Sequence, residues 1–329
     1  MDREIEKLSE RLEREEISLK EKANEIKEDG KISMDISKEK LDLSVSGVDG
    51  GFSRKKLRGI ELVITRSCLV EMTYEDNKLI NHSYFPDSNP SPNLYSYDVR
   101  EENSKKPQIL RMNEEITTAL KYINGDPNVD MLILDGSIVP NPHNKPKESS
   151  EERENYDLLV KKYEELFRKS LDKGIQLIGA VEDSKSRKVS KKKGVNSLDN
   201  ILLHHVLDKG QRTPEFNYSD EPGKHPVLSD FSMDISNRIK FMYLKPVEED
   251  TPLRIEYLSG TMNSEKIASV VQEVSKISNS YSYPVPLMEA DLHAKLTEKE
   301  TDLIIRRIKN QAGENPVLME KRRNTRPFH

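Results

Sequence analysis

The sequence has one cysteine, no tryptophan and few aromatic residues among its 329 positions. The single cysteine, Cys68, excludes an internal disulfide framework and a cysteine-based zinc cluster, and it suits a reducing compartment. No segment approaches the run of about 18 apolar residues that a membrane-spanning helix requires. The first residues contain no apolar signal core. We therefore expect a cytoplasmic protein that is not secreted.

Several catalytic motifs are also missing. The chain has no Gly-x-x-x-x-Gly-Lys-Ser/Thr loop, no Gly-x-Gly-x-x-Gly after a strand and no Gly-x-Ser-x-Gly. Cys68 lies inside an expected strand. The sequence therefore gives no support to ATP hydrolysis by a P-loop or to nucleophilic acyl chemistry.

Charged residues, in contrast, make up 34% of the chain. The 53 Lys and Arg residues nearly balance the 58 Asp and Glu residues, which leaves a net charge of -5. The placement of these charges is therefore more informative than their sum. Eleven acidic and seven basic residues lie in the first thirty positions, and six basic residues lie in one later loop.

Residues 1–30 are predicted to form a helix that ends near Gly30. Its apolar positions follow a seven-residue repeat: Ile5, Leu8, Leu12, Leu19 and Ile26. A helix this charged buries little by itself. Two interpretations stay open, a surface helix packed on its own domain and an arm that forms a dimer or contacts another protein.

We expect one α/β domain over residues 40–310, followed by a charged tail over 311–329. The predicted strands carry alternating or continuous apolar residues; they span 41–51, 59–72, 79–85, 129–137, 175–181, 241–244 and 253–257. The predicted helices carry apolar residues at helical spacing; they span 108–123, 151–172, 197–208, 263–277 and 286–309. Four prolines predict a long loop over 86–107. This order of elements predicts a mixed sheet with helices on its faces.

Two acidic residues lie at the ends of predicted apolar strands, each directly before a glycine. Asp49 precedes Gly50-Gly51, and Asp135 follows a buried strand and precedes another glycine. Such a carboxylate is costly unless it is paired or bound to a cation. Two of them at one sheet edge would suit magnesium or manganese, and two such ions about 4 Å apart cleave phosphodiesters. The alternative interpretation is two unrelated turns.

Other side chains could join this site. Glu115 lies one residue from the apolar face of its predicted helix, with Glu114 beside it. Asp291 and His293 begin the last helix, but residues two apart do not share a helix face. We therefore expect only one of that pair to face the site. Each of these four side chains could instead be a solvated surface group.

A basic loop follows the strand that ends near Asp183, and Asp199 lies beyond it. The loop has six cationic residues in nine positions: Lys185, Arg187, Lys188, Lys191, Lys192 and Lys193. Such a run neutralises several phosphates, with binding that weakens as salt rises. The alternative is a solvated loop, but its place beside the expected carboxylate edge favours nucleic-acid binding.

Four motifs, in order along the chain, resemble those of the NurA nuclease family. They are Ser-Gly-Val-Asp-Gly-Gly at 46–51, Leu-Ile-Leu-Asp-Gly-Ser at 132–137, Ile-Gly-Ala-Val-Glu-Asp-Ser at 178–184 and Tyr-Pro-Val-Pro-Leu at 283–287. The resemblance implies a ribonuclease H-like fold and manganese-dependent cleavage of DNA by a homodimer. It also implies partnership with a HerA hexameric translocase in archaeal DNA end resection and recombinational repair. Members of the family act as 5′-to-3′ exonucleases and as single-strand endonucleases.

The resemblance also implies roles for individual residues. Asp49 and Asp135 correspond to the metal ligands of the first and the central strand, and Glu115 is favoured over Glu114 as the helical ligand. We expect their carboxylates to lie in one cluster that holds two manganese ions, with magnesium as the alternative.

Two departures from the family pattern bear on the activity. Glu182 stands where the family usually has a lysine, and Asp291 stands where it has a histidine, with His293 two positions later. Asp291 or His293 would complete the metal shell. Tyr283 would stack on a base or orient a phosphate, with simple packing as the alternative. The departures leave open a rival function, a catalytically degenerate DNA-binding or adaptor protein with the same fold.

Overall fold

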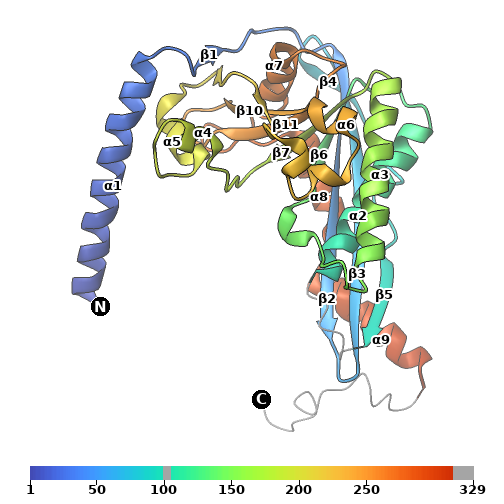
Figure 1. Cartoon of the computed structure of the whole chain (residues 1–329). Helices are drawn as coiled ribbons and strands as arrows, with labels where there is room; N and C mark the ends of the chain where they lie inside the picture. The colour runs from blue at the N-terminus through green and yellow to red at the C-terminus, as the bar shows by residue number, and fades with distance from the viewer. Residues whose placement is uncertain (99–104, 314–329) are drawn as a thin grey trace.

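The computed structural model describes residues 1–98 and 105–313, and within them eleven strands form one mixed sheet with helices on both faces (Figure 1). The strands are β1 (Met34–Asp35), β2 (Leu43–Lys56), β3 (Ile60–Glu75), β4 (Lys78–Phe85), β5 (Asn93–Asp98), β6 (Met131–Asp135), β7 (Gln176–Val181), β8 (Gln211–Arg212), β9 (Phe216–Asn217), β10 (Ile239–Lys245) and β11 (Leu253–Leu258). The helices are α1 (Asp2–Glu28), α2 (Lys106–Asn124), α3 (Arg153–Asp172), α4 (Lys188–Lys192), α5 (Asp199–Val206), α6 (Met233–Arg238), α7 (Ser264–Val274), α8 (Val285–Ala294) and α9 (Glu298–Gln311). The predicted fold class is confirmed.

Within the sheet, the pairing of β2 with β6 stops before β2 ends, and this leaves an open edge. The strand order is β1-β8-β10-β11-β7-β6-β2-β3-β4, with β5 beside β3 and β9 beside β10. β2, β6 and β7 run parallel to one another, whereas the other pairs are antiparallel. The pairing of β2 with β6 ends at Val48 and Leu134, but β2 continues to Lys56 beside β3. The carboxyl ends of β6 and β7 therefore face open space beside the centre of β2.

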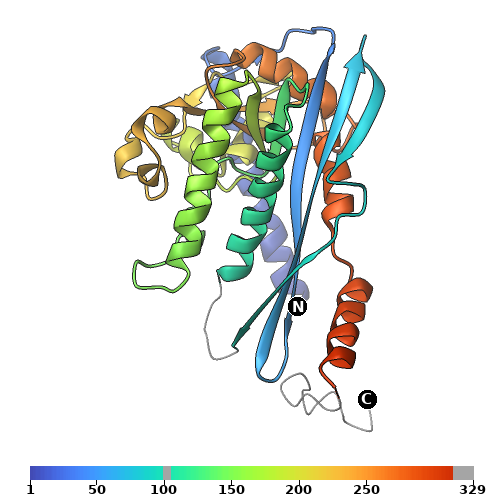
Figure 2. The same ribbon diagram turned by 90° about the vertical axis from the view of Figure 1, so that its right-hand side faces the viewer.

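Helices cover both faces of the sheet. On one face, α2 and α3 pack over a core that includes Val48 and Leu134, and on the other α7 and α8 pack over Val45 and Ile133. These residues alternate along their strands, as the period of two requires. Figure 2 shows the green and teal helices and the red helices on opposite sides of the long blue ribbon. Side chains near the strand ends therefore point alternately to one helix layer or the other.

Three predicted boundaries were wrong. The first strand does not stop at Gly50-Gly51 but continues to Lys56, because glycine here allows close packing: a Cβ on Gly51 would lie 2.4 Å from the carbonyl oxygen of Ala294 on α8. The loop predicted over 86–107 contains β5, which pairs with the part of β3 that β4 leaves free. The helix predicted over 286–309 is two helices, because Thr297 and Glu300 form a capping box that starts α9. Residues 99–104 of the loop predicted over 86–107 lie outside the described residues.

Helix α1 packs on the body only near its carboxyl end. Leu19, Ala23 and Ile26 contact the cluster that α5 builds, whereas Ile5 and Leu8 are 60% and 55% exposed. In Figure 1 the helix extends away from the sheet toward the free N-terminus. None of the described helices is long and apolar enough to cross a membrane. Most of the predicted tail, residues 314–329, lies outside the described part of the chain.

Candidate active site

Two of the predicted carboxylates meet at the open edge of the sheet. Asp135 is the last residue of β6, and Asp49 follows Val48, the last residue of β2 that pairs with β6. Both line one cavity of about 360 Å³, together with Asp291 and Glu182. Asp49 is only 6% exposed. Burial, and after it the charge of Asp135, raise the pKa of the Asp49 carboxyl to about 7.

An arginine on α2 joins Asp49 to Glu115. Arg111 Nη1 lies 3.4 Å from Asp49 Oδ1 and 3.3 Å from Glu115 Oε2, and it donates to the Gly50 carbonyl oxygen at 3.1 Å. Arg111 and Glu115 are four residues apart and thus share one helix face. Glu115 is buried, and burial raises the pKa of its carboxyl well above the usual range while Arg111 opposes the shift. Arg111 was not among the predicted site residues, although its four-residue spacing from Glu115 signals that the two side chains share a helix face.

Glu114 points elsewhere and joins α2 to β5. Its Oε1 accepts a hydrogen bond from the Tyr95 hydroxyl at 2.6 Å, and its Oε2 accepts one from Asn93 Nδ2 at 2.8 Å. Of the two neighbouring glutamates, Glu115 is therefore the one that reaches the edge of the sheet.

Tyr283 contacts Asp135 directly. Its hydroxyl lies 2.5 Å from Asp135 Oδ1 and 3.1 Å from the carbonyl oxygen of Ala180. The Tyr283 side chain is buried, and burial and the neighbouring Asp135 charge raise its pKa, so the hydroxyl keeps its proton and donates. This geometry favours positioning of Asp135 over stacking on a base. The neighbouring Tyr281, which the sequence analysis did not select, is exposed and donates to Glu182 at 2.9 Å.

Asp291 and His293 face different surroundings, as the helical spacing predicted. Asp291 lines the cavity, and its charge contributes to the raised pKa of Asp49. His293 instead lies against β4 and the loop after it. Its Nδ1 is 2.5 Å from the Ser88 carbonyl oxygen, its Nε2 is 3.2 Å from Glu289 Oε1, and its ring is 4.6 Å from that of Tyr84. The structure therefore does not bring His293 to the carboxylates.

The carboxylates suit a divalent cation in charge and in donor type. Asp49, Asp135 and Asp291 share a cavity, and their mutual repulsion is the kind that a bound cation relieves. Across residues 1–98 and 105–313, however, no three His, Cys, Asp or Glu side chains are arranged as a complete metal-binding group. The expected metal-binding cluster of Asp49, Glu115 and Asp135 is therefore not formed as such in these residues: Asp49 and Asp135 line the cavity, and Glu115 is linked to Asp49 through Arg111.

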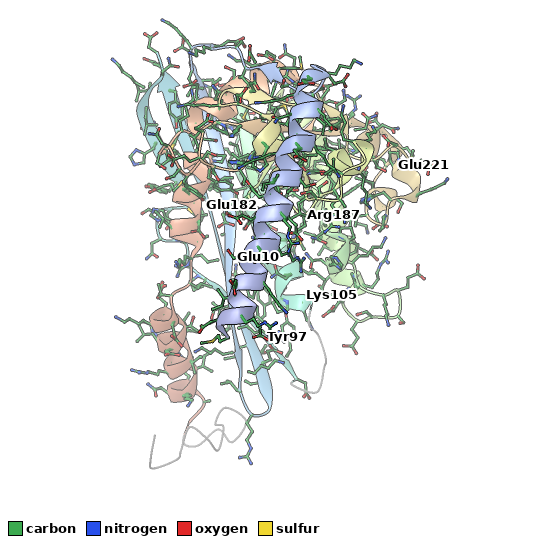
Figure 3. All side chains as sticks on the ribbon, turned by 90° about the vertical axis from the view of Figure 1, so that its left-hand side faces the viewer. Glu10, Tyr97, Lys105, Glu182, Arg187 and Glu221 are labelled. Carbon is green, nitrogen blue, oxygen red and sulfur yellow. The ribbon has the colours of Figure 1, made fainter. Side chains whose placement is uncertain are left out.

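The basic segment follows β7 and is partly folded as α4. Lys185 and Lys188 line a second cavity, and Lys188, Lys191 and Lys192 line a third. Two members have protein partners instead: Arg187 donates to Asn196 at 3.4 Å, and Lys193 pairs with Asp29 at 3.3 Å. Figure 3, seen from the side of α1, shows Glu182 and Arg187 to either side of that helix in the view.

Buried Asp199 fixes this segment to the sheet. Its Oδ1 accepts hydrogen bonds from the Ser190 amide at 2.9 Å and hydroxyl at 2.8 Å, and its Oδ2 accepts one from Ser186 at 2.7 Å. The Tyr243 hydroxyl donates to Oδ2 at 3.1 Å. Asp199, which sequence reasoning placed only beside the loop, therefore orders the lysines of α4.

The mixed sheet with helices on both faces, with carboxylates beside the ends of its parallel strands, is the ribonuclease H-like architecture predicted from the sequence. The model of the NurA domain family matches residues 43–296, and the chain therefore belongs to the NurA family. The NurA nuclease from Sulfolobus solfataricus is similar in structure, with a TM-score of 0.61 and 16% identity over 95% of each chain. A NurA structure bound to dAMP and manganese has a TM-score of 0.61 and 13% identity, over 97% of this chain and 100% of the other. A search of curated proteins finds no match.

Proposed function

We propose that this protein is a manganese-dependent deoxyribonuclease that hydrolyses phosphodiester bonds at the open edge of its sheet. One observation carries the proposal: Asp49, Asp135 and Asp291 line a single cavity where β6 ends. A related NurA structure binds dAMP and manganese, which are a nucleotide and a divalent cation of the kinds that this cavity suits. Magnesium is the alternative cation.

Asp49, Asp135 and Asp291 would hold the cations, two in number, and Glu115 would join them from α2. Divalent cations supply two things in this chemistry, the activation of a water molecule and the stabilisation of the leaving 3′ oxygen. The chain's own contribution is positioning. Tyr283 fixes the orientation of Asp135, while Arg111 keeps the charges of Asp49 and Glu115 balanced.

The finer parts of the proposal follow the family. The protein would act as a 5′-to-3′ exonuclease and as a single-strand endonuclease on duplex ends and single strands. It would work as a cytoplasmic homodimer with a HerA-type translocase in DNA end resection and repair. Lys185, Lys188, Lys191 and Lys192, which line cavities beside the carboxylates, would bind the DNA backbone.

The test is a nuclease assay on linear single- and double-stranded DNA with manganese, magnesium or EDTA. Substrates labelled at one end or the other report polarity, and the assay is run with and without the translocase. We expect Asp49→Ala and Asp135→Ala to lose at least about a hundredfold in rate, because each removes a direct cation ligand. Asp172→Ala, which changes an exposed carboxylate at the end of α3, is the matched control.

A second function, that of a non-catalytic DNA-binding or adaptor protein, rests on the residues that depart from the family. Asp291 replaces the usual histidine and Glu182 the usual lysine, so the cavity carries more negative charge than the pattern predicts. If wild type and both variants are equally inactive with manganese and with the translocase present, this second function stands and the nuclease proposal fails.

A further inference from the structure

A second cavity of about 500 Å³ lies beside the carboxylate edge. Its lining includes Ser137 from the segment after β6, Asp183 and Lys185 from the segment after β7, and Arg254 from β11. His143, Lys188 and Tyr218 also line it. None of the residues around this cavity belongs to the candidate metal site.

The two cavities lie beside the same strand ends. Asp135 lines the first cavity, and Ser137 lines the second. In the same way, Glu182 lines the first, whereas its neighbours Val181 and Asp183 line the second. The segments after β6 and β7 therefore contribute to both cavities, and a DNA strand that passes over these strand ends would contact both.

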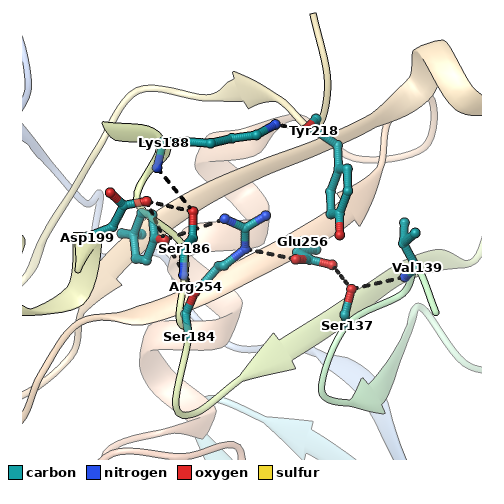
Figure 4. Close-up of polar contacts among 10 residues, drawn as sticks. Ser137, Val139, Ser184, Ser186, Lys188, Asp199, Tyr218, Arg254 and Glu256 are labelled. Carbon is teal, nitrogen blue, oxygen red and sulfur yellow. Dashed lines mark hydrogen bonds and ion pairs between the residues drawn. The ribbon is translucent and has the colours of Figure 1, made fainter. Parts of the chain in front are cut away.

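A buried ion pair forms the floor of the second cavity. Arg254 and Glu256 are 5% and 2% exposed, and Arg254 Nε lies 2.8 Å from Glu256 Oε1. The Ser137 hydroxyl donates to the other oxygen of Glu256 (Figure 4). The Arg254 guanidinium lies 4.0 Å from the centre of the Phe241 ring. The negative charge of Glu256 is thus balanced inside the protein. Such a pair adds little stability by itself, because both charges lose their hydration.

The rest of the lining combines cations with flat aromatic groups. Lys185 and Lys188 supply positive charge at the rim, and Lys188 donates to the carbonyl oxygen of Tyr218 with its Nζ 5.4 Å from the Tyr218 ring centre. The centres of the Tyr218 and His225 rings lie 5.5 Å apart, and the exposed His143 also lines the cavity. Cations bind phosphate, and aromatic or imidazole rings stack on bases. The cavity therefore offers contacts to both the phosphate and the base of a nucleotide.

We propose that this second cavity binds one nucleotide of a single DNA strand, a few positions away from the bond that is cut. The inference rests on the proposed nuclease function, since it assigns the path of the same substrate. Lys185 and Lys188 bind the phosphate, and Tyr218 and His143 contact the base. The strand crosses the end of β7 between the two cavities.

The test compares how tightly two substrates of different length are held. A dinucleotide reaches only the carboxylate cavity, whereas an octanucleotide reaches both. In wild type we expect the KM of the octanucleotide to be about tenfold lower than that of the dinucleotide, since one stacked base and one phosphate supply this much. In the double variant His143→Ala/Lys185→Ala we expect this ratio to fall to about twofold. Lys161→Ala, an exposed lysine on α3, should keep the tenfold ratio.

The outcomes separate the inference from the proposed function. If wild type cleaves both substrates and the folded double variant keeps the full ratio, the second cavity does not bind the strand. If wild type cleaves neither, the proposed function fails, and fluorescence anisotropy of the labelled octanucleotide still tests the cavity by the same variants. Competition by inorganic phosphate as strong as that by dAMP would reduce the cavity to a simple anion site and overturn the nucleotide assignment.

Discussion

At the scale of single residues, the site is a problem of charge balance. Asp49 and Glu115 are both buried, and each would repel the other and Asp135 if all were ionised. The Arg111 guanidinium lies within 3.4 Å of both carboxylates and offsets part of this repulsion. A buried charge that loses its partner costs several kcal/mol. Arg111 therefore makes it possible for the carboxylates to lie together in the protein before any cation binds.

This balance predicts how stability depends on pH. Because the pKa of Asp49 rises from 3.8 to about 7 on folding, the folded state holds a proton that the unfolded state releases between these values. The free energy of unfolding should therefore fall as pH rises from about 4 to 7, by at most about 4 kcal/mol for a shift of about three units. Urea unfolding in EDTA at several pH values measures the slope, which we expect to be smaller in Asp49→Asn. Equal slopes in the two proteins would contradict the prediction.

Tyr283 offers a test of positioning. Tyr283→Phe keeps the ring but removes the hydrogen bond to Asp135, and a hydrogen bond to a charged group is worth about 1.5–3 kcal/mol. We expect the rate of DNA cleavage to fall by about tenfold or more at saturating manganese, with an unchanged circular dichroism spectrum. Tyr74→Phe, which loses only a contact with the Met72 sulfur, serves as the control. A rate for Tyr283→Phe equal to that of this control would show that the hydroxyl does not matter.

Helix α8 provides a pair of variants two positions apart. Asp291→Asn should weaken manganese binding by about tenfold or more, since Asp291 lines the cavity with Asp49 and Asp135. His293→Gln should leave binding within about twofold, because the imidazole contacts Ser88 and Glu289 instead. Isothermal titration with manganese measures both. The reverse order of effects would assign the ligand to His293.

At the scale of elements, α4 depends on one buried carboxylate. Burial alone would raise the pKa of Asp199, but hydrogen bonds from Ser190 and Ser186 lower it overall, so the carboxylate stays ionised. It thereby binds Ser186, which precedes α4, and Ser190, which lies within it. Asp199→Ala should loosen α4, with faster amide hydrogen exchange there and DNA affinity several-fold lower. Asp172→Ala is the control for loss of an acidic residue. Unchanged exchange in α4 would show that the helix is held by other contacts.

The elements also show what the sequence could and could not predict. The apolar run before Asp135 correctly placed this carboxylate at a strand end, and the motifs led to the correct family. Asp49 was also predicted at a strand end, but it lies inside β2, at the point where pairing with β6 has stopped. The contact of Arg111 with Asp49, unlike its spacing from Glu115, was not predictable, because it depends on where pairing of β2 with β6 stops. Likewise, Gly51 was predicted to end a strand. Both a tight turn and a close contact with a helix require glycine, and only the position of α8 shows that the close contact is the reason here.

At the scale of the whole molecule, the body of the protein covers only part of the apolar stripe on α1. Leu19 and Ile26 pack beside α5, and the same seven-residue repeat continues through Leu12, Leu8 and Ile5, which are 56%, 55% and 60% exposed. Because the packed and the exposed positions share one helix face, the body covers the stripe only at its carboxyl end. A second copy of α1 would cover the remainder with the same spacing.

Replacing Ile5, Leu8 and Leu12 by Gln should therefore convert a homodimer into a monomer, while the packed end of α1 keeps the body intact. Size-exclusion chromatography with light scattering measures the mass, and Leu158→Gln, an exposed leucine on α3, is the control. A triple variant that stays dimeric would place the dimer interface elsewhere. If the wild type is itself a monomer, we propose that the exposed stripe contacts the translocase instead, and the same triple variant should then lose translocase binding in a mixing experiment with the purified partner.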